Sequence, residues 1–120
     1  MCLNGYSTSS LMNKSNIFVY IELSKLVSGL NANVLLAKNS LKLQASYFNI
    51  IPSKYFSEDL SPEWERILQQ IKQHGPLLDE DGNVVMSAIA NTIAQMSQQE
   101  CVTIAMSIIN LYEKVKLELD

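Results

Sequence analysis

Apolar residues recur at helical spacing in the segment from Ile17 to Leu30. The repeating positions are Val19, Leu23, Leu26, Val27 and Leu30. Offsets of three and four residues place such side chains on one face of a helix. Residues 17–21 are also β-branched and aromatic enough for a strand, which stays open as the alternative. We favour a helix that ends near Gly29 or Asn31.

A second helix is predicted from Asn33 to Ile51. Its apolar face consists of Val34, Ala37, Leu41, Ala45 and Phe48. Residues 41–45 also alternate between apolar and polar, as a half-buried strand does, but the longer helical pattern outweighs this alternative. Pro52 is expected to end the helix, because the residue before a proline is pushed out of the helical region.

The most distinct helix start in the chain is Ser61-Pro62-Glu63. The serine can cap the helix, the proline suits its first position, and the glutamate suits its first turn. The apolar stripe that follows is narrow and consists of Trp64, Ile67, Leu68 and Ile71. The run His74-Gly75-Pro76 predicts the end of this helix.

The last third of the chain, Asn83 to Leu117, is predicted to form two apolar helices that join at Met96-Ser97. The first is expected to bury Val85, Met86, Ile89, Ile93 and Met96. The second is expected to bury Cys101, Ile104, Ala105, Ile108, Tyr112 and Val115. The two stripes differ in direction by roughly a third of a turn at about 100° per residue. This mismatch and the capping box from Ser97 to Glu100 favour a break over one continuous rod.

These segments predict an all-α fold, a compact bundle of four or five helices. The length of 120 residues suits one domain, which we expect over residues 15–120. Residues 1–14 are rich in serine and asparagine and show no periodicity, so we expect a flexible N-terminal tail.

The charges are divided unevenly along the chain. Residues 1–57 carry five lysines against one glutamate, whereas residues 58–120 carry eleven acids against four basic residues. Attraction between the two halves within the fold is the simplest interpretation, and steering of a basic partner to the acidic half is the alternative. Nucleic-acid binding is disfavoured, because no cluster of lysine and arginine is present to neutralise phosphates.

The two cysteines, Cys2 and Cys101, are too few and too far apart for a disulfide framework. We therefore expect free thiols in a reducing compartment, the cytoplasm. We also expect no membrane association, because no apolar run approaches the roughly 18–20 residues that a spanning helix needs.

Candidate chemical groups do not combine into a site. The acidic run from Asp79 resembles the start of a calcium loop, but its sixth and twelfth residues are Val84 and Ala90 where glycine and glutamate are needed. His74 and Cys101 could form a nucleophilic pair only with a third, orienting group. We therefore expect no catalytic residue, no metal ligand and no cofactor, and a protein that is not an enzyme.

The leading hypothesis is a protein-interaction module: a small adaptor, inhibitor or regulatory subunit that acts as a homodimer or in a heteromeric complex. The residues predicted to bind a partner are Trp64, Met106, Leu111 and Leu117. Trp64 is a large anchor on a narrow stripe, and the other three widen the apolar face of the last helix. The alternative is a binding protein for an apolar ligand or lipid, with a pocket lined by Met86, Met96 and Met106.

Overall fold

A computed structural model of the protein describes residues 16–119. The expected flexible tail, residues 1–14, lies outside these described residues. The chain begins with an N-terminal helix, residues 16–28. It continues through α2 (Ala37–Leu43), α3 (Tyr47–Ile50), the 3₁₀ turn η1 (Ser53–Tyr55), α4 (Ser61–Ile71), β1 (Leu77–Leu78), β2 (Val84–Met86), α5 (Ala88–Gln95) and α6 (Gln98–Leu119). The all-α fold class is confirmed, with six α-helices and one two-stranded ribbon in the described part.

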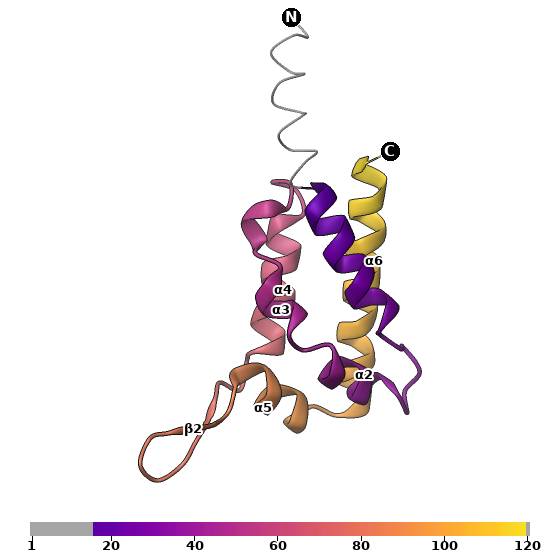
Figure 1. Ribbon diagram of the computed structural model, residues 1–120. Helices are drawn as coiled ribbons and strands as arrows, with labels where there is room; N and C mark the ends of the chain where they lie inside the picture. The colour runs from indigo at the N-terminus through magenta and orange to yellow at the C-terminus, as the bar shows by residue number, and fades with distance from the viewer. Residues whose placement is uncertain (1–15, 120) are drawn as a thin grey trace, which may run out of the picture.

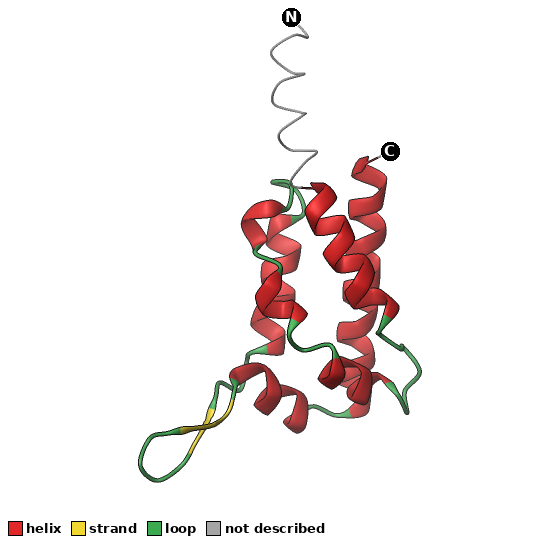
Figure 2. Cartoon of the chain, viewed as in Figure 1, coloured by secondary structure: helices red, strands yellow, loops and turns green. Residues whose placement is uncertain are grey.

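The long helix α6 is the element against which the others are arranged. The N-terminal helix runs beside its C-terminal half, where the rings of Tyr20 and Tyr112 stack at 5.5 Å (Figure 1). Helix α4 packs along α6 from another side, and α2 and α5 close the end of the bundle at which α6 begins. Figure 2 shows that the two strands stand apart from this helical body.

The core contains a cluster of three aromatic side chains with Trp64 at its centre. The ring of Phe48 stacks on Trp64 at 5.9 Å and the ring of Phe56 at 5.5 Å. The indole Nε1 of Trp64 donates a hydrogen bond of 2.9 Å to the carbonyl oxygen of Ile51. These contacts hold the segment between α3 and α4 against the middle of the bundle, so the narrow stripe predicted on α4 is a core stripe.

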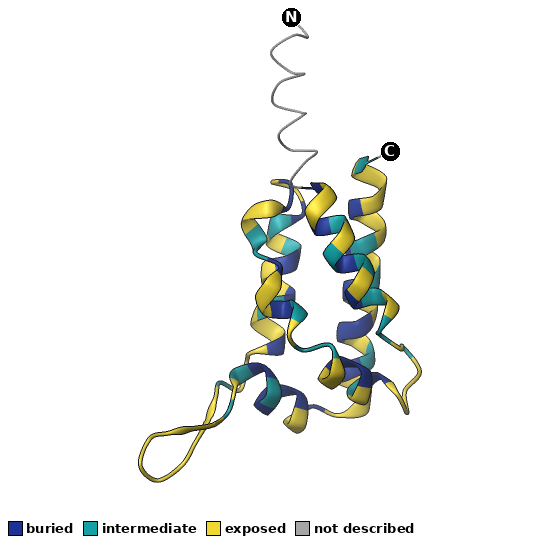
Figure 3. Ribbon diagram, viewed as in Figure 1, coloured by how far each residue is buried: buried dark blue, intermediate teal, exposed yellow. Residues whose placement is uncertain are grey.

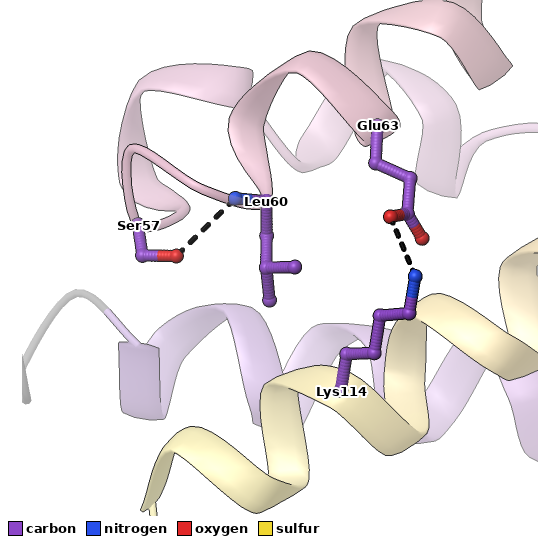
Figure 4. Close-up of polar contacts among 4 residues, drawn as sticks. All are labelled: Ser57, Leu60, Glu63 and Lys114. Carbon is purple, nitrogen blue, oxygen red and sulfur yellow. Dashed lines mark hydrogen bonds and ion pairs between the residues drawn. The ribbon is translucent and has the colours of Figure 1, made fainter.

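Two polar contacts fix the start of α4 and its pairing with α6 (Figure 4). The hydroxyl of Ser57 accepts a hydrogen bond of 3.3 Å from the backbone N–H of Leu60, and Lys114 lies 2.8 Å from the carboxylate of Glu63. Ser61 is the first residue of α4, and the capping position is occupied by Leu60. The predicted capping role of Ser61 is therefore wrong, and the side chain that binds a backbone N–H here comes from Ser57, three residues before Leu60.

The predicted helix from Asn33 to Ile51 is interrupted, and this expectation is corrected. Its first residues form a turn in which Val34 is exposed, and the chain turns again at residues 44–46 between α2 and α3. Ala37, Leu41 and Phe48 are nevertheless buried as the apolar stripe requires. The break has a tertiary cause: α2 packs against α5 and α6, whereas α3 directs Phe48 at Trp64 in α4.

The predicted break at Ser97 is confirmed in its detail. The hydroxyl of Ser97 accepts from the backbone N–H of Glu100 at 3.1 Å, and the carboxylate of Glu100 accepts from the N–H of Ser97 at 2.9 Å. This reciprocal pair is a capping box, which satisfies two backbone donors at the start of α6. Lys38 of α2 also donates to the carbonyl oxygens of Ala94 and Met96, at 3.0 and 2.8 Å, and so anchors the end of α5.

The capping box predicts a pH-dependent contribution to stability. The hydrogen bond from the Ser97 N–H lowers the pKa of Glu100 below its ordinary value of 4.5. The stabilisation is complete above the unfolded-state pKa and is lost as the pH falls through the lower folded-state pKa. Glu100→Gln keeps a capping side chain but cannot titrate, so its free energy of unfolding should approach that of the wild type as the pH drops below about 4.

Urea titrations of both proteins between pH 7 and pH 3 would measure this convergence. Ser97→Ala, which removes the other half of the box, should lower the free energy of unfolding by about 1 kcal/mol. A gap between wild type and Glu100→Gln that stays constant over this pH range would contradict the assignment.

Candidate interaction surface

A β-hairpin, residues 77–86, projects from the body between α4 and α5 (Figure 1). Its two strands run antiparallel, with Leu77 opposite Met86 and Leu78 opposite Val84. One residue of β2, Val85, is therefore extra in this register and forms a β-bulge. The hairpin occupies the segment where a helix from Asn83 was expected, so that expectation is wrong: the helix begins after the cap Ser87, whose hydroxyl accepts from the N–H of Ala90 at 3.1 Å.

The tip of the hairpin is built by Asp79. Its carboxylate accepts from the backbone N–H groups of Asp81 at 2.9 Å and Asn83 at 2.8 Å. The N–H of Asn83 is the main cause that lowers the pKa of Asp79. Gly82 has a φ of 84°, a left-handed conformation that glycine adopts without strain. The acidic run thus folds as a turn, with Asp79 as a structural acceptor and with Glu80 and Asp81 facing solvent.

The strands of the hairpin expose nearly all of their apolar side chains. Leu77 and Leu78 are 43% and 51% exposed, and Val84 and Val85 are 65% and 59% exposed. Because successive residues of a strand point to opposite faces, both faces of the ribbon carry exposed apolar groups. Figure 3 shows the hairpin as a continuous exposed segment, in contrast to the mixed faces of the helices.

Further exposed apolar residues lie on the helices. Leu36 and Leu43 are seven residues apart, two helical turns, so they share the outer face of α2. On the N-terminal helix, Phe18 packs edge-on against the ring of Tyr55 at 5.4 Å beside exposed Ile17. Val34 and Leu35 extend the exposed group at the start of α2, and Ile21 extends the one on the N-terminal helix. The hairpin differs from both groups because its four exposed apolar side chains lie on a ribbon that stands apart from the helical body.

The four residues predicted to bind a partner fall into two groups. Trp64 and Leu111 are fully buried in the core and present no surface in this fold. Met106 and Leu117 are 42% and 70% exposed on the outer side of α6. On α6 the sequence pattern did not separate Leu111 from Met106 and Leu117, because a helix that is apolar around much of its circumference does not reveal which sides neighbours will cover. On α4 a narrow stripe with one large side chain suits a core and a partner equally well.

Two shallow hollows lie between α4 and α6. One of about 200 Å³ is lined by Met96 and Ile104 among polar side chains, and the other, of about 250 Å³, is crossed by the pair Glu63 and Lys114. Their linings are mainly glutamine, hydroxyl and charged groups, which differ from the apolar walls typical of lipid pockets. Of the three methionines expected around an apolar ligand, only Met96 lines either hollow; Met86 lies in β2 and Met106 faces outward.

The reactive residues do not converge within residues 16–119. Cys101 is a buried free thiol whose pKa is raised by burial, so it stays protonated and unreactive at neutral pH. His74 is exposed in the turn that follows α4, where its backbone N–H donates to the hydroxyl of Thr92 at 3.1 Å. No group of three potential metal-ligating residues is found in this part of the chain. Cys2 lies outside it.

No protein-family model, curated protein or solved structure matches the chain. None of the helices within residues 16–119 combines the length and the apolar character that crossing a membrane requires. The candidate interaction surface is therefore identified only from the exposure and the backbone geometry of the hairpin.

A signal for the hairpin was present in the sequence. Asp81-Gly82 is a strong turn pair, and it lies between two short apolar runs, Leu77-Leu78 and Val84-Val85. The expectation of a helix from Asn83 instead counts Val85 and Met86 as part of the helical stripe that continues through Ile89 to Met96. The β-branched pair Val84-Val85, which follows Gly82 closely, indicates a strand rather than a helix.

Proposed function

We propose that the protein is a protein-interaction module that acts by binding rather than by catalysis, and that the hairpin is its principal docking element. The observation that carries this proposal is the exposure of Leu77, Leu78, Val84 and Val85 together on a two-stranded ribbon. An isolated two-stranded ribbon is only marginally stable in water, and three or more strands or a packed helix are needed to stabilise it.

The hairpin suits recognition by strand addition. In this mode an exposed sheet edge pairs with an extended segment of a partner, and the side chains of alternate residues provide specificity. The acidic tip, with exposed Glu80 and Asp81, favours a partner that presents positive charge beside the added strand. The buried free thiol of Cys101 supports a reducing compartment for this activity, which we propose is the cytoplasm.

Site-specific photocrosslinking in the cells that produce the protein tests this function. A photoreactive residue in place of Val85 should form covalent protein adducts, because that side chain would lie in the docking interface. The same residue in place of exposed Glu113, on the outer side of α6, is the matched control and should form few. Adding Leu78→Asp should abolish the adducts at position 85, since a charge would then be buried against the partner.

Equal labelling at positions 85 and 113, or adducts that persist in the Leu78→Asp protein, would show that the hairpin is not a docking element. Circular dichroism of each variant should retain the helical spectrum of the wild type. This control separates loss of binding from loss of fold.

A further inference from the structure

We propose that the partner of the hairpin is a second copy of the same chain, and that two β2 strands pair across a two-fold axis to form a four-stranded antiparallel sheet. This inference rests on the proposed function.

The hydrogen bonds at the hairpin tip show which backbone groups face outward. The N–H of Asp79 donates to the carbonyl oxygen of Asn83 at 2.9 Å. The next pair toward the body, Leu78 and Val84, is consequently a non-hydrogen-bonded pair. In such a pair the backbone N–H and C=O groups point away from each other, so those of Val84 face the outer edge of β2 and those of Leu78 face the outer edge of β1.

The two outer edges are not equivalent. Pro76 lies two residues before Leu78 and so falls on the same outer edge of β1. It has no N–H to donate, and a proline on an edge strand blocks further pairing. The outer edge of β2 follows Asn83 and contains the β-branched pair Val84-Val85 without a proline. The geometry therefore leaves β2 as the edge open to strand addition.

A two-fold axis at Val84 pairs this edge with itself. The N–H of each Val84 then donates to the carbonyl oxygen of the other copy, the self-complementary contact that an isologous dimer requires. Leu78 and Val84 of both copies form a continuous apolar stripe across one face of the sheet. Four strands also exceed the number at which a sheet becomes stable without other support.

Charge complementarity favours the same register. Because the two β2 strands run antiparallel about Val84, the acidic tip of each hairpin, with Glu80 and Asp81, lies on the side of the axis where β2 of the second copy leads into α5. Ser87 and Ala88 form the start of α5, whose first turn contains no acidic residue of its own. The N-terminal end of a helix carries partial positive charge, which stabilises nearby carboxylates. Each acidic tip therefore points toward the positive end of a helix in the other copy.

Cysteine crosslinking on the full-length protein tests the pairing. In a Cys2→Ser background, Val84→Cys places two thiols beside the two-fold axis. Glu80→Cys is the matched control on the same hairpin: it is equally accessible, but it lies in the turn beyond Asn83, so its two copies would be on opposite sides of the two-fold axis and away from it. With a short bifunctional thiol reagent and micromolar protein, the Val84→Cys protein should crosslink on the order of tenfold faster than the Glu80→Cys protein, because the dimer makes the reaction at position 84 intramolecular.

Size-exclusion chromatography with light scattering gives the second measurement. The wild type and Val84→Thr, which keeps the N–H and the β-branched shape, should form dimers. Val84→Pro removes the outward-facing donor and should be monomeric with an unchanged helical spectrum. Glu80→Gln with Asp81→Asn should raise the dimer Kd several-fold, since the attraction to α5 is lost.

A wild type that stays monomeric at high concentration, or equal crosslinking of the Val84→Cys and Glu80→Cys proteins, would overturn the self-pairing. A tighter dimer after removal of the two acids would overturn the register. If the photoreactive residue at position 85 captures a different protein while the purified chain is monomeric, self-pairing is wrong and the docking function of the hairpin stands.

Discussion

Replacing Trp64 with alanine is expected to lower the free energy of unfolding by about 3–5 kcal/mol, as is typical of a fully buried large aromatic side chain. Trp64 has no exposed surface, and its ring is stacked between Phe48 and Phe56. Truncation removes both stacking contacts and leaves a cavity where α3, α4 and the intervening loop meet. Because small domains are stable by only about 5–15 kcal/mol, this variant should be close to unfolding at 25 °C.

Trp64→Phe is the matched control, since it retains a ring between the two phenylalanines. It loses the hydrogen bond from Nε1 to the carbonyl oxygen of Ile51, and an unsatisfied buried acceptor costs about 1–3 kcal/mol. Urea denaturation followed by circular dichroism would rank wild type, Trp64→Phe and Trp64→Ala in that order. A small effect of Trp64→Ala would mean that Trp64 is exposed, as the alternative of a partner-binding anchor requires.

The second large effect is expected at Leu111. Leu111→Ala should lower the free energy of unfolding by about 2–5 kcal/mol, the usual range for a buried leucine. Leu117→Ala, on the same helix and with the same chemistry, should change it by no more than about 0.5 kcal/mol. The physical reason is burial: Leu111 is 0% exposed against the core of the bundle, whereas Leu117 is 70% exposed near the end of α6.

The same denaturation measurement on both variants compares two sites that differ only in their surroundings. Equal losses would show that the end of α6 is covered in solution, and would place Leu117 in an interface. Repeating the pair at several protein concentrations would identify self-association as the cause, because a dimer interface makes stability concentration-dependent.

Features encoded within a few residues were predictable from the sequence. The break at Ser97 depends on one reciprocal pair of hydrogen bonds, Ser97 with Glu100, and both partners lie within four residues. The turn after α4 is also local: α4 ends at Ile71, and Gly75, whose φ of 66° suits glycine, and Pro76 follow in the next few residues. Helix caps and turn residues of this kind depend only on neighbouring residues in the sequence.

The candidate site was harder to predict for a physical reason. A valine pair such as Val84-Val85 fits a helical stripe and a strand equally well over so short a length. The interruption between α2 and α3 also has no local breaker, because no glycine or proline lies at residues 44–46. Each outcome depends on which neighbour the segment packs against, and those neighbours are far away in sequence.

The amino-acid pattern alone was sufficient for the all-α class, the apolar stripes of α4 and α6, and the capping box between α5 and α6, because periodicity and caps act within one or two helical turns. The packed fold was needed to place Trp64 and Leu111 in the core, to leave Met106 and Leu117 on the surface, and to form the hairpin. An apolar side chain has the same transfer free energy wherever it lies in the sequence. Whether it is buried or exposed depends on the three-dimensional arrangement of its neighbours.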